Sequence, residues 1–549
     1  MANDINTWPD PPQRPKKKTL AQGIKETFFE YCSNTSIHGI KFFGENRSWT
    51  ERIIWICVFI ASLYWCINAL KEIADKYRET PVIVSFSEKS TDIWNIPFPA
   101  VTICSEIKRT QRSGPSYSDL SEWYDENPHD LAKNLSSTDL HEFLTMLQIC
   151  PLTAIENDVR IPLAEPLDFF QTLDEMLPDF EITFPICAWF YSEAVECERL
   201  LTKTYTEEGI CYTFNALNAT DLYRENTVQY ERMGLSQPMD SIETLNRTLS
   251  WTLAEGYAEN SPLFTYPARI LKSGAKTGLH VVVRAFKNDS DSSCTGPMQG
   301  LKILLHAPDD VQMVSESFIR LSMQRQVSIA VKPQMTTTSK NIEAFTPAQR
   351  QCQMPDERYL RFFKVYTEKN CELECLTNFT LAQCGCVRFA MPRTWDMPVC
   401  REDQMECYAS AEGNLSAMFF SSDFKESTNK CNCLPACTSL DYDVEISEGN
   451  FKAEAIGEQY IDDLEYAAFH IYFKDNKFFT SHRSELYGYY DFIASCGGIF
   501  GLFMGVSLLS VFEILYHVTL RLWNNYKEKK CLLHNSQDQL TVTLNAKIR

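Results

Sequence analysis

The sequence predicts a membrane protein of mixed α and β structure, in which two transmembrane segments flank a large, disulfide-rich extracellular domain. Two long apolar segments, at 53–70 and about 488–520, lie near the two ends of the chain. Sixteen of the 21 cysteines lie between them. Because disulfides persist in oxidising compartments and are rare in the cytosol, this cysteine-rich middle is expected outside the cell.

The composition indicates an ordered chain and argues against one class of partner. With 549 residues, of which 44% are hydrophobic, the chain can bury a sizeable core. The formal net charge is -20. Nucleic-acid binding requires clustered lysine and arginine side chains, so this balance argues against a nucleic-acid partner.

The first apolar segment is predicted to be a transmembrane helix. Residues 53–70 carry no charge, and as a helix they would span about 27 Å, close to the hydrocarbon thickness of a bilayer. The segment lies far from Met1 and ends in bulky residues, so we interpret it as an uncleaved anchor and not as a signal peptide. Basic residues flank the two apolar segments on their outer sides, which places residues 1–52 and 523–549 in the cytosol.

Seven segments of the expected extracellular domain, residues 71–485, have the β-branched content typical of strands. They are far apart in the sequence, so a sheet built from them has non-local connections. The stretches around 110–200 and 350–440 are expected to be helical or irregular insertions. The seven segments are Thr80–Ser87, Ile96–Cys104, Gly278–Arg284, Leu301–His306, Val327–Lys332, Tyr442–Ile446 and Tyr466–Phe473.

Ten cysteines are concentrated within residues 352–437. Their CxC and CxxxC pairs could hold zinc, but this window contains no histidine and the expected compartment is oxidising, so disulfides are favoured. Spacing alone leaves their connectivity open. The ten are Cys352, Cys371, Cys375, Cys384, Cys386, Cys400, Cys407, Cys431, Cys433 and Cys437.

Six glycosylation sequons fall within the same expected extracellular domain. Sequons also occur by chance, so they support this topology only weakly, and their use would establish it. The acceptor residues are Asn134, Asn218, Asn246, Asn288, Asn378 and Asn414.

The second apolar segment, assigned to residues 486–522, is too long and too polar for a plain anchor. The 33 residues Gly488–Leu520 would reach about 50 Å as one helix, so the helix either projects beyond the bilayer or breaks within it. Two charged residues, Asp491 and Glu513, lie in this stretch. An ionisable side chain is costly in a membrane, so Glu513 is expected to face water or a partner.

Three glycines in this segment recur every four residues, at Gly497, Gly501 and Gly505. On a helix they share one bare face, which lets another backbone approach closely. Taken alone, this pattern is typical of helix packing. Glycine also permits non-helical backbone at membrane depth, and such backbone is tolerated where it lines a water-filled pore.

Four signatures occur in one order between and around the two membrane segments: HGIKFFG (38–44), IPFPAVTIC (96–104), GICYTFN (209–215) and the ten-cysteine cluster. In this combination the chain resembles the degenerin/epithelial sodium channel superfamily, most closely its pickpocket-like branch. The resemblance covers about residues 36–523. It implies a trimer of subunits, each with a β-sheet palm and a helical thumb and finger, and the thumb corresponds to residues 352–437.

The resemblance also implies disulfide pairs. In the family, nested bridges staple the thumb. Cys150 and Cys294 have no counterpart in the shared pattern, and parity alone suggests that they form an additional bridge. The implied family pairs are Cys352–Cys437, Cys371–Cys433, Cys375–Cys431, Cys384–Cys407, Cys386–Cys400, Cys104–Cys211 and Cys187–Cys197.

The family's pore residues can be placed on this sequence by its motifs. Gly505-Val506-Ser507 matches the tripeptide that interrupts the pore helix and forms the selectivity filter. His38-Gly39 matches the cytosolic pair that influences gating, in a segment that re-enters the membrane. Two single positions complete the set: Ala494 matches a gating position that requires a small residue, and Glu513 would attract cations at the inner mouth of the pore.

The sequence departs from its relatives at several positions. Ser495 stands where many relatives have aspartate, and Tyr516 and His517 occupy a region where the family often carries a second acid. Gln349 replaces a tryptophan of proton-gated relatives, which leaves Tyr77 without that aromatic partner. The replacement at Gln349 argues against transfer of the proton-sensing mechanism, whereas the missing second acid bears on ion block and conductance.

Together these features predict a ligand- or stimulus-gated, sodium-selective cation channel subunit of the amiloride-sensitive type, in the plasma membrane. It would assemble with like or related subunits, contact lipid, pass Na⁺ and require no cofactor or bound metal. An extracellular ligand is expected but not identified. An enzyme is not expected, because residues 505–509 lack the final glycine of a GxSxG elbow. The alternative is a non-conducting or obligate heteromeric receptor subunit.

Overall fold

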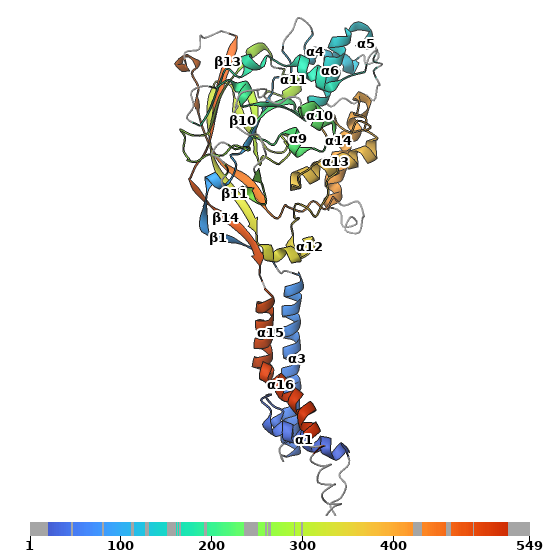
Figure 1. Cartoon of the computed structure of the whole chain (residues 1–549). Helices are drawn as coiled ribbons and strands as arrows, with labels where there is room; N and C mark the ends of the chain where they lie inside the picture. Colours follow the sequence, from blue (N-terminus) through green and yellow to red (C-terminus); the bar gives the residue numbers. More distant parts are fainter. Residues whose placement is uncertain are drawn as a thin grey trace, which may run out of the picture. The chain divides into compact units, whose positions relative to one another are not determined.

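The computed structural model describes residues 20–44, 48–79, 82–110, 115–126, 131–150, 161, 163, 166–190, 195–234, 251–258, 261, 265–289, 291–297, 300–420, 431–456, 463–486, 488–524 and 527. It contains two compact units (Figure 1). The helical unit comprises Met1–Val82 and Glu485–Arg549, and the disulfide-rich unit comprises Ile83–Ser484.

The helical unit is built around the long helix α3. Its 31 residues, Trp49–Glu79, extend beyond both ends of the apolar segment 53–70. The apolar run is therefore shorter than the helix that contains it. Beyond Leu70 the helix continues with charged residues, where Lys76 and Glu72 form an ion pair at 3.2 Å one turn apart. The other helical elements are α1 (Leu20–Asn34), α2 (Lys41–Gly44), α15 (Tyr489–Met504), α16 (Leu508–Tyr516) and a π-helical turn η8 (His517–Arg521).

The second apolar segment is broken. Helix α15 ends at Met504, α16 begins at Leu508, and the two are bent by 67° at the break. Among the described residues, α3 is the one helix that is long and apolar enough by itself to cross a membrane. The bent pair Tyr489–Met504 and Leu508–Asn524 meets the same criteria only if it is counted as one broken span.

Two β-sheets form the centre of the disulfide-rich unit. The larger has the strand order β1-β14-β11-β13-β8-β3, with β12 also paired to β11, and the smaller has the order β10-β9-β2-β5-β4. A short hairpin, β6-β7, stands apart. The bounds are β1 Val82–Asp92, β2 Ala100–Ser105, β3 Ile186–Trp189, β4 Thr202–Thr206, β5 Gly209–Phe214, β6 Trp251–Thr252, β7 Gly256–Tyr257, β8 Leu279–Phe286, β9 Gly300–His306, β10 Ile319–Ser322, β11 Arg325–Thr338, β12 Ser439–Asn450, β13 Leu464–Phe473 and β14 Lys477–Glu485.

All seven predicted strand segments overlap a strand of the structure. The larger sheet joins strands distant in sequence, as expected, since β11 runs parallel to both β13 and β14. Strand β14 was missed because its sequence, KFFTSHRSE, is too polar to show the alternation of a half-buried strand. It is held by pairing with β11, and no local signal reports that pairing.

Apolar side chains that alternate along the strands fill the core between the two sheets. Val101 and Ile103 of β2 lie in one buried cluster with Val281 of β8, Ile329 of β11 and Ile471 of β13. Each is at most 1% exposed. This packing fixes the register of the strands, because a shift by one residue would turn every buried side chain to the opposite face.

Helices lie around the sheets, most of them in the regions predicted to be insertions but α9, α10 and α11 outside those regions. Figure 1 places α13 and α14 next to each other. The hydrophobic core of this helical region includes Phe143 and Leu147 of α6, together with Phe362 and Phe363 from the chain before α13. The helices are α4 Tyr117–Glu126, α5 Leu131–Asn134, α6 Ser137–Ile149, α7 Phe169–Met176, α8 Phe180–Thr183, α9 Ala219–Leu222, α10 Val228–Gly234, α11 Ser292–Thr295, α12 Pro347–Arg350, α13 Glu368–Cys384 and α14 Met405–Phe420, with short 3₁₀ turns at Ile93–Asn95, Cys197–Arg199, Lys287–Asp289, Lys340–Ala344, Glu402–Gln404 and Ala453–Ile456.

Eight disulfides cross-link this unit. Five lie in the thumb region: Cys384–Cys407 joins α13 to α14, two more join α13 to Cys431 and Cys433, and the remaining two link the chain around these helices. The additional pair Cys150–Cys294 is also formed. The other seven are Cys104–Cys211, Cys187–Cys197, Cys352–Cys437, Cys371–Cys433, Cys375–Cys431, Cys384–Cys407 and Cys386–Cys400, the same pairs as those implied by the resemblance.

Three of the sequon asparagines, Asn134, Asn378 and Asn414, are exposed at the surface of this unit, and Asn218 is half-buried. Asn246 and the side chain of Asn288 lie outside the described residues. The three exposed positions are therefore open to modification.

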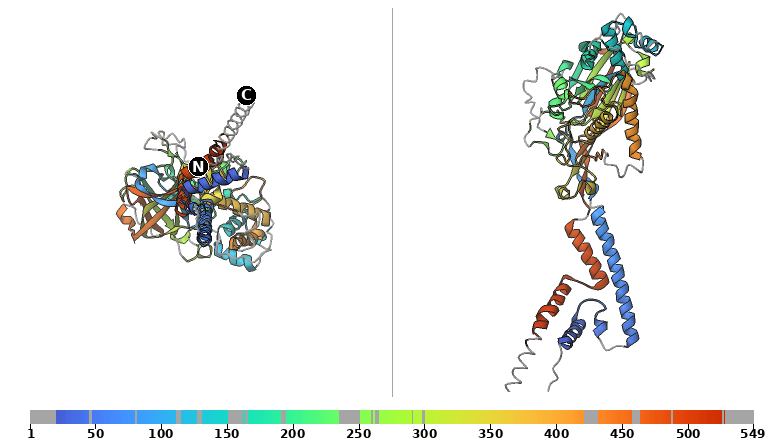
Figure 2. Two further views of the ribbon diagram at one scale, coloured as in Figure 1. Left: turned by 90° about the horizontal axis from the view of Figure 1, so that it is seen from below. Right: turned by 90° about the vertical axis from the view of Figure 1, so that its right-hand side faces the viewer.

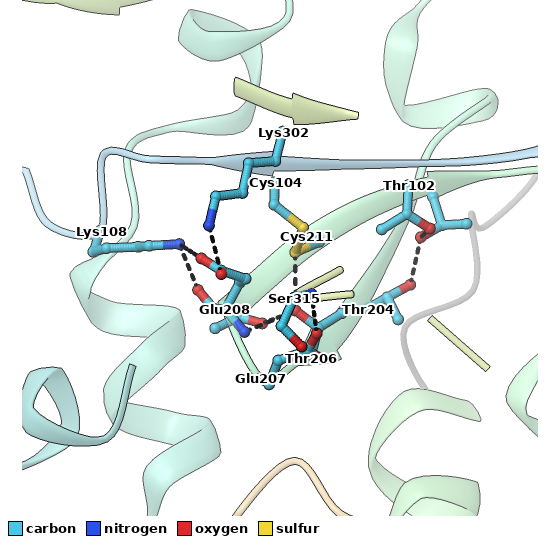
Figure 3. The surroundings of a disulfide bond; sticks show 12 residues. Thr102, Cys104, Lys108, Thr204, Thr206, Glu207, Glu208, Cys211, Lys302 and Ser315 are labelled. Carbon is cyan, nitrogen blue, oxygen red and sulfur yellow. Dashed lines mark hydrogen bonds and ion pairs between the residues drawn. A yellow bond between two sulfur atoms is a disulfide. The ribbon is translucent and has the colours of Figure 1, made fainter. Parts of the chain in front are cut away.

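A buried cluster of charges lies beside the Cys104–Cys211 disulfide (Figure 3). Lys108 Nζ donates to Glu208 Oε2 at 2.9 Å, and Lys302 Nζ donates to Glu208 Oε1 at 2.6 Å. The Glu208 side chain is 8% exposed. Burial acts to raise the pKa of Glu208, but the two ammonium groups outweigh it and lower that pKa to about 2.

We expect Glu208→Gln to destabilise the protein by about 3 kcal/mol at neutral pH, because it removes the buried carboxylate that accepts hydrogen bonds from both Lys108 and Lys302. Since the folded pKa of Glu208 lies below the ordinary 4.5, its contribution is present above that pH and is lost as the pH falls towards 2. Thermal melts of detergent-solubilised protein at neutral pH and at about pH 3 measure both effects.

The matched control is Glu196→Gln, which removes a carboxylate from the exposed Arg199–Glu196 pair. Its melting temperature should stay close to that of the parent. Equal melting temperatures for the two variants would show that the Glu208 cluster does not stabilise the fold.

Candidate functional site

Left-handed backbone at Gly505 breaks the second apolar segment. Gly505 has φ +66° and ψ 20°, a conformation that residues with a Cβ rarely adopt. It ends α15, and its N–H donates to the carbonyl of Gly501 at 3.0 Å. Ser507 then caps α16, where its hydroxyl accepts from the N–H of Ser510 at 3.3 Å. Two helix ends therefore meet within three residues.

The carbonyls of Gly505 and Val506 accept no hydrogen bond among the residues that the structure describes. At the same break, the carbonyl of Met504 accepts one from a distant segment. Unpaired carbonyls are costly in a hydrocarbon environment unless they contact water, an ion or a partner chain. The break thus presents backbone oxygens that can bind a ligand.

The distant segment is the one that contains His38 and Gly39, between α1 and α2. The N–H of His38 donates to the carbonyl of Met504 at 2.9 Å. A Cβ placed on Gly505 would lie 2.7–2.8 Å from atoms of the His38 ring, so the ring occupies the space that a side chain at Gly505 would need. Figure 2 shows this segment folded back beside the break. The two motifs are therefore in direct contact.

Glu513 is held by the same segment. Its Oε2 accepts from the N–H of Ser36 at 3.3 Å and from the Ser36 hydroxyl at 3.1 Å. The Ser36 hydroxyl also lies 2.7 Å from that of Ser510, which is fully buried. A continuous chain of polar groups thus runs from Ser507 through Ser510 and Ser36 to Glu513.

Sequence reasoning missed Ser36 and Ser510. One signal was present, because Ser507, Ser510 and Glu513 recur every three residues and so share one face of α16. The docking of Ser36 on that face joins residues 474 positions apart, which no local pattern reports.

A second contact, also missed, fastens α1 to the turn η8 that follows α16. Arg521 donates to Glu30 Oε1 from Nε at 3.1 Å and from Nη2 at 2.7 Å. The rings of Tyr31 and His517 meet edge to face with centroids 5.4 Å apart. Charge-assisted bonds from a guanidinium are among the stronger polar contacts. They hold α1 in place, and α1 leads directly into Ser36 and His38.

Helix α15 is attached to α3 on one side and open on another. The Ser62 hydroxyl of α3 donates to the carbonyl of Phe503 at 2.6 Å, and the rings of Tyr77 and Phe492 pack with centroids 4.8 Å apart. Tyr77 therefore has an aromatic partner within the helical unit, although Gln349 replaces the expected tryptophan.

The open side of α15 carries the small residues. Ala494 is exposed, and a Cβ added at Gly497 or Gly501 would meet no atom within 4 Å in the described part of the chain. The His38 ring covers Gly505, whereas the part of the glycine face at Gly497 and Gly501 is uncovered in the described part of the chain. It can receive the backbone of another helix or border an aqueous path.

The family model described as "Amiloride-sensitive sodium channel" matches residues 31–517. The chain belongs to this family. The match begins just before the His38-Gly39 segment and ends at His517, so it includes both motifs that meet at the break.

Three relatives of known name each align with more than nine tenths of this chain. It is 27% identical to "Pickpocket protein 28" of Drosophila melanogaster over 520 residues, 91% of this chain and 79% of the relative. It is 23% identical to "Sodium channel protein Nach" of the same species, over 92% of this chain and 89% of the relative. It is 21% identical to "Acid-sensing ion channel 2" of Rattus norvegicus, over 91% of this chain and 88% of the relative.

A solved structure of a proton-activated chloride channel covers 85% of this chain and 96% of its own, with 7% identity and a TM-score of 0.27, a likeness too low to carry an argument. Two of the sequence relatives have names that describe ion channels and not enzymes, in agreement with the expectation from the sequence.

Proposed function

We propose that the chain is a subunit of an amiloride-sensitive, sodium-selective cation channel in the plasma membrane, and that Na⁺ passes the break at Gly505–Ser507. In this proposal α3 and the bent pair α15–α16 are the two membrane spans, both chain ends are cytosolic, and the disulfide-rich unit is extracellular. Three subunits around one axis would contribute three copies of each pore residue.

One observation supports this proposal above the others, namely the broken helix with its unpaired carbonyls at Gly505 and Val506. Carbonyl oxygens at a constriction can replace part of the hydration shell of a cation. The exposed hydroxyl of Ser507 can add a third oxygen per subunit. A helix that served only as an anchor would have no need of such a break.

His38 and Gly39 are proposed to control opening, because His38 binds the break directly and Gly39 is the next residue of the same segment. The N–H of His38 satisfies the Met504 carbonyl, and its ring packs on Gly505. A displacement of this segment would change the conformation of the filter residues. Ala494, on the open face of α15, is proposed to act at the extracellular side of the same path.

Glu513 is proposed to raise the local cation concentration at the inner mouth. Its carboxylate is half-buried and accepts two hydrogen bonds from Ser36, which fix its position without removing its charge. The gating stimulus is proposed to be extracellular. The alternative function is a non-conducting receptor or an obligate heteromeric subunit.

Recording from cells that express Ala494→Val tests the proposal. A bulky residue at this position should hold the path open and give a constitutive Na⁺-dependent current that amiloride blocks. Ala494→Gly keeps the position small and is the matched control, expected to stay closed. If the Ala494→Val protein reaches the cell surface and carries no current, this result would contradict conduction by this chain alone. It would favour the non-conducting receptor or the obligate heteromeric subunit.

The Glu30–Arg521 pair gives a further prediction, measured in the Ala494→Val channel. Glu30→Arg or Arg521→Glu alone should lower the current roughly fivefold, because a partly exposed, doubly bonded pair contributes about 1 kcal/mol to the position of α1. The double swap should restore most of the current, since it rebuilds the pair with reversed polarity.

Reversal of an unrelated charge is the control for this swap. Lys76→Glu alters the exposed Glu72–Lys76 pair on α3 and should leave the current unchanged. A double swap no better than either single variant would show that the Glu30–Arg521 contact does not position α1.

A further inference from the structure

Two histidines of the disulfide-rich unit face each other across neighbouring strands. His280 of β8 is directly opposite His470 of β13 in the antiparallel register. Their rings lie 5.9 Å apart between centroids, with an angle of 70° between the ring planes. Directly paired residues project from the same face of a sheet. The two imidazoles therefore share one site.

The surroundings leave these rings accessible. In the same row of the sheet, His280 is flanked by Ala188 of β3 and His470 by Ser328 of β11, both small residues. Both histidines are half-buried. The two rings are therefore partly exposed to solvent while the strands keep them in place.

The protonation of His470 suits a metal ligand. Its Nε2 lies 3.2 Å from the carbonyl oxygen of Thr277, and a carbonyl can only accept, so Nε2 carries the proton. In the neutral ring Nδ1 then has a free lone pair. Histidines that bind metals commonly donate their other ring N–H to a backbone carbonyl in this way.

Electrostatics favour the neutral rings. Burial lowers the pKa of His280, and the neighbouring His470 lowers it further. Burial also lowers the pKa of His470, against the opposing effect of its bond to Thr277. The neutral ring is the form of imidazole that binds metal ions.

We propose that His280 and His470 together bind a divalent transition-metal ion of the zinc type, with water in the remaining positions. With a Zn–N distance of about 2.1 Å, two imidazoles on one tetrahedral ion have ring centres about 5 to 6 Å apart, which is the separation observed. Among the described residues no group of three or more His, Cys, Asp or Glu is placed to hold a metal. Two protein ligands therefore define an exchangeable site and not a structural one. This inference does not depend on the proposed conduction.

Titration of the purified full-length protein in detergent with Zn²⁺, in competition with a chromophoric chelator, tests the proposal. His280→Gln and His470→Gln should each weaken one Zn²⁺ site at least tenfold. His482→Gln is the matched control, because His482 is a half-buried histidine on β14 that bonds to Thr337 and is not placed opposite another imidazole. It should bind Zn²⁺ like the parent protein.

Electron paramagnetic resonance with Cu²⁺, which also favours imidazole ligands, reports the ligands directly. The parent protein should show coupling to two imidazole nitrogens, and each single variant to one. Unchanged Zn²⁺ affinity in both His280→Gln and His470→Gln, or an equal loss in His482→Gln, would overturn the proposal. Thermal melts without metal show whether any variant fails to fold.

Discussion

Gly505→Ala is expected to abolish the current of the Ala494→Val channel while the protein still reaches the cell surface. At φ +66° the added Cβ costs about 1–2 kcal/mol of backbone strain. The same Cβ would lie within 2.8 Å of the His38 ring, so the ring must also move. Both effects act on the break itself. Amiloride-sensitive current normalised to surface protein should fall more than tenfold.

The matched control for this prediction lies on the same helix. A Cβ at Gly498 would meet no atom within 4 Å in the described part of the chain, and the residue has ordinary helical backbone. Gly498→Ala should therefore keep its current within about twofold, since alanine also favours a helix. A Gly505→Ala channel with normal current would contradict a filter built on left-handed backbone.

Glu513→Lys is expected to reduce the inward Na⁺ conductance more than tenfold. The substitution replaces negative charges at the inner mouth with positive ones, and it removes the acceptor for Ser36. Glu513→Gln separates the two effects, because its amide oxygen can still accept from Ser36 while the charge is lost. Its conductance should fall less than that of the lysine variant.

Salt dependence identifies the cause of the Glu513 effect. A charge effect is screened as the ionic strength rises, because the Debye length falls from about 10 Å at 0.1 M to about 3 Å at 1 M. The loss in Glu513→Lys should therefore shrink in single-channel recordings at high salt. A loss independent of salt would indicate that the lysine disrupts the packing of Ser36.

The strands and the long helix α3 could be predicted where local sequence carries their signal. The β-branched runs of β11 and β13 and the apolar run of α3 each specify an element by themselves. Local sequence did not predict strand β14 or the 31-residue length of α3. The first depends on pairing with a distant strand, and the second on charged residues that an apolar pattern does not include.

The site was predictable only in part, for the same reason. Gly505–Ser507, His38 and Glu513 were found through their motifs, and the chain's own chemistry suggested a polar break. The contacts between them could not be found, since Ser36 meets Ser510 across 474 positions and Glu30 meets Arg521 across 491. Such pairs arise only when the segment before α3 folds back onto the break.

Cysteine accessibility at Ser507 in the Ala494→Val channel tests the central claim most directly. The account predicts that a cationic thiol reagent applied from outside blocks the current of Ser507→Cys, and that amiloride slows this block. The current of the Ala494→Val parent, which has only its native cysteines, should not respond to the reagent. A robust Na⁺ current that the reagent leaves unchanged in Ser507→Cys, despite labelling of the thiol, would contradict it, because the ions would then bypass the break.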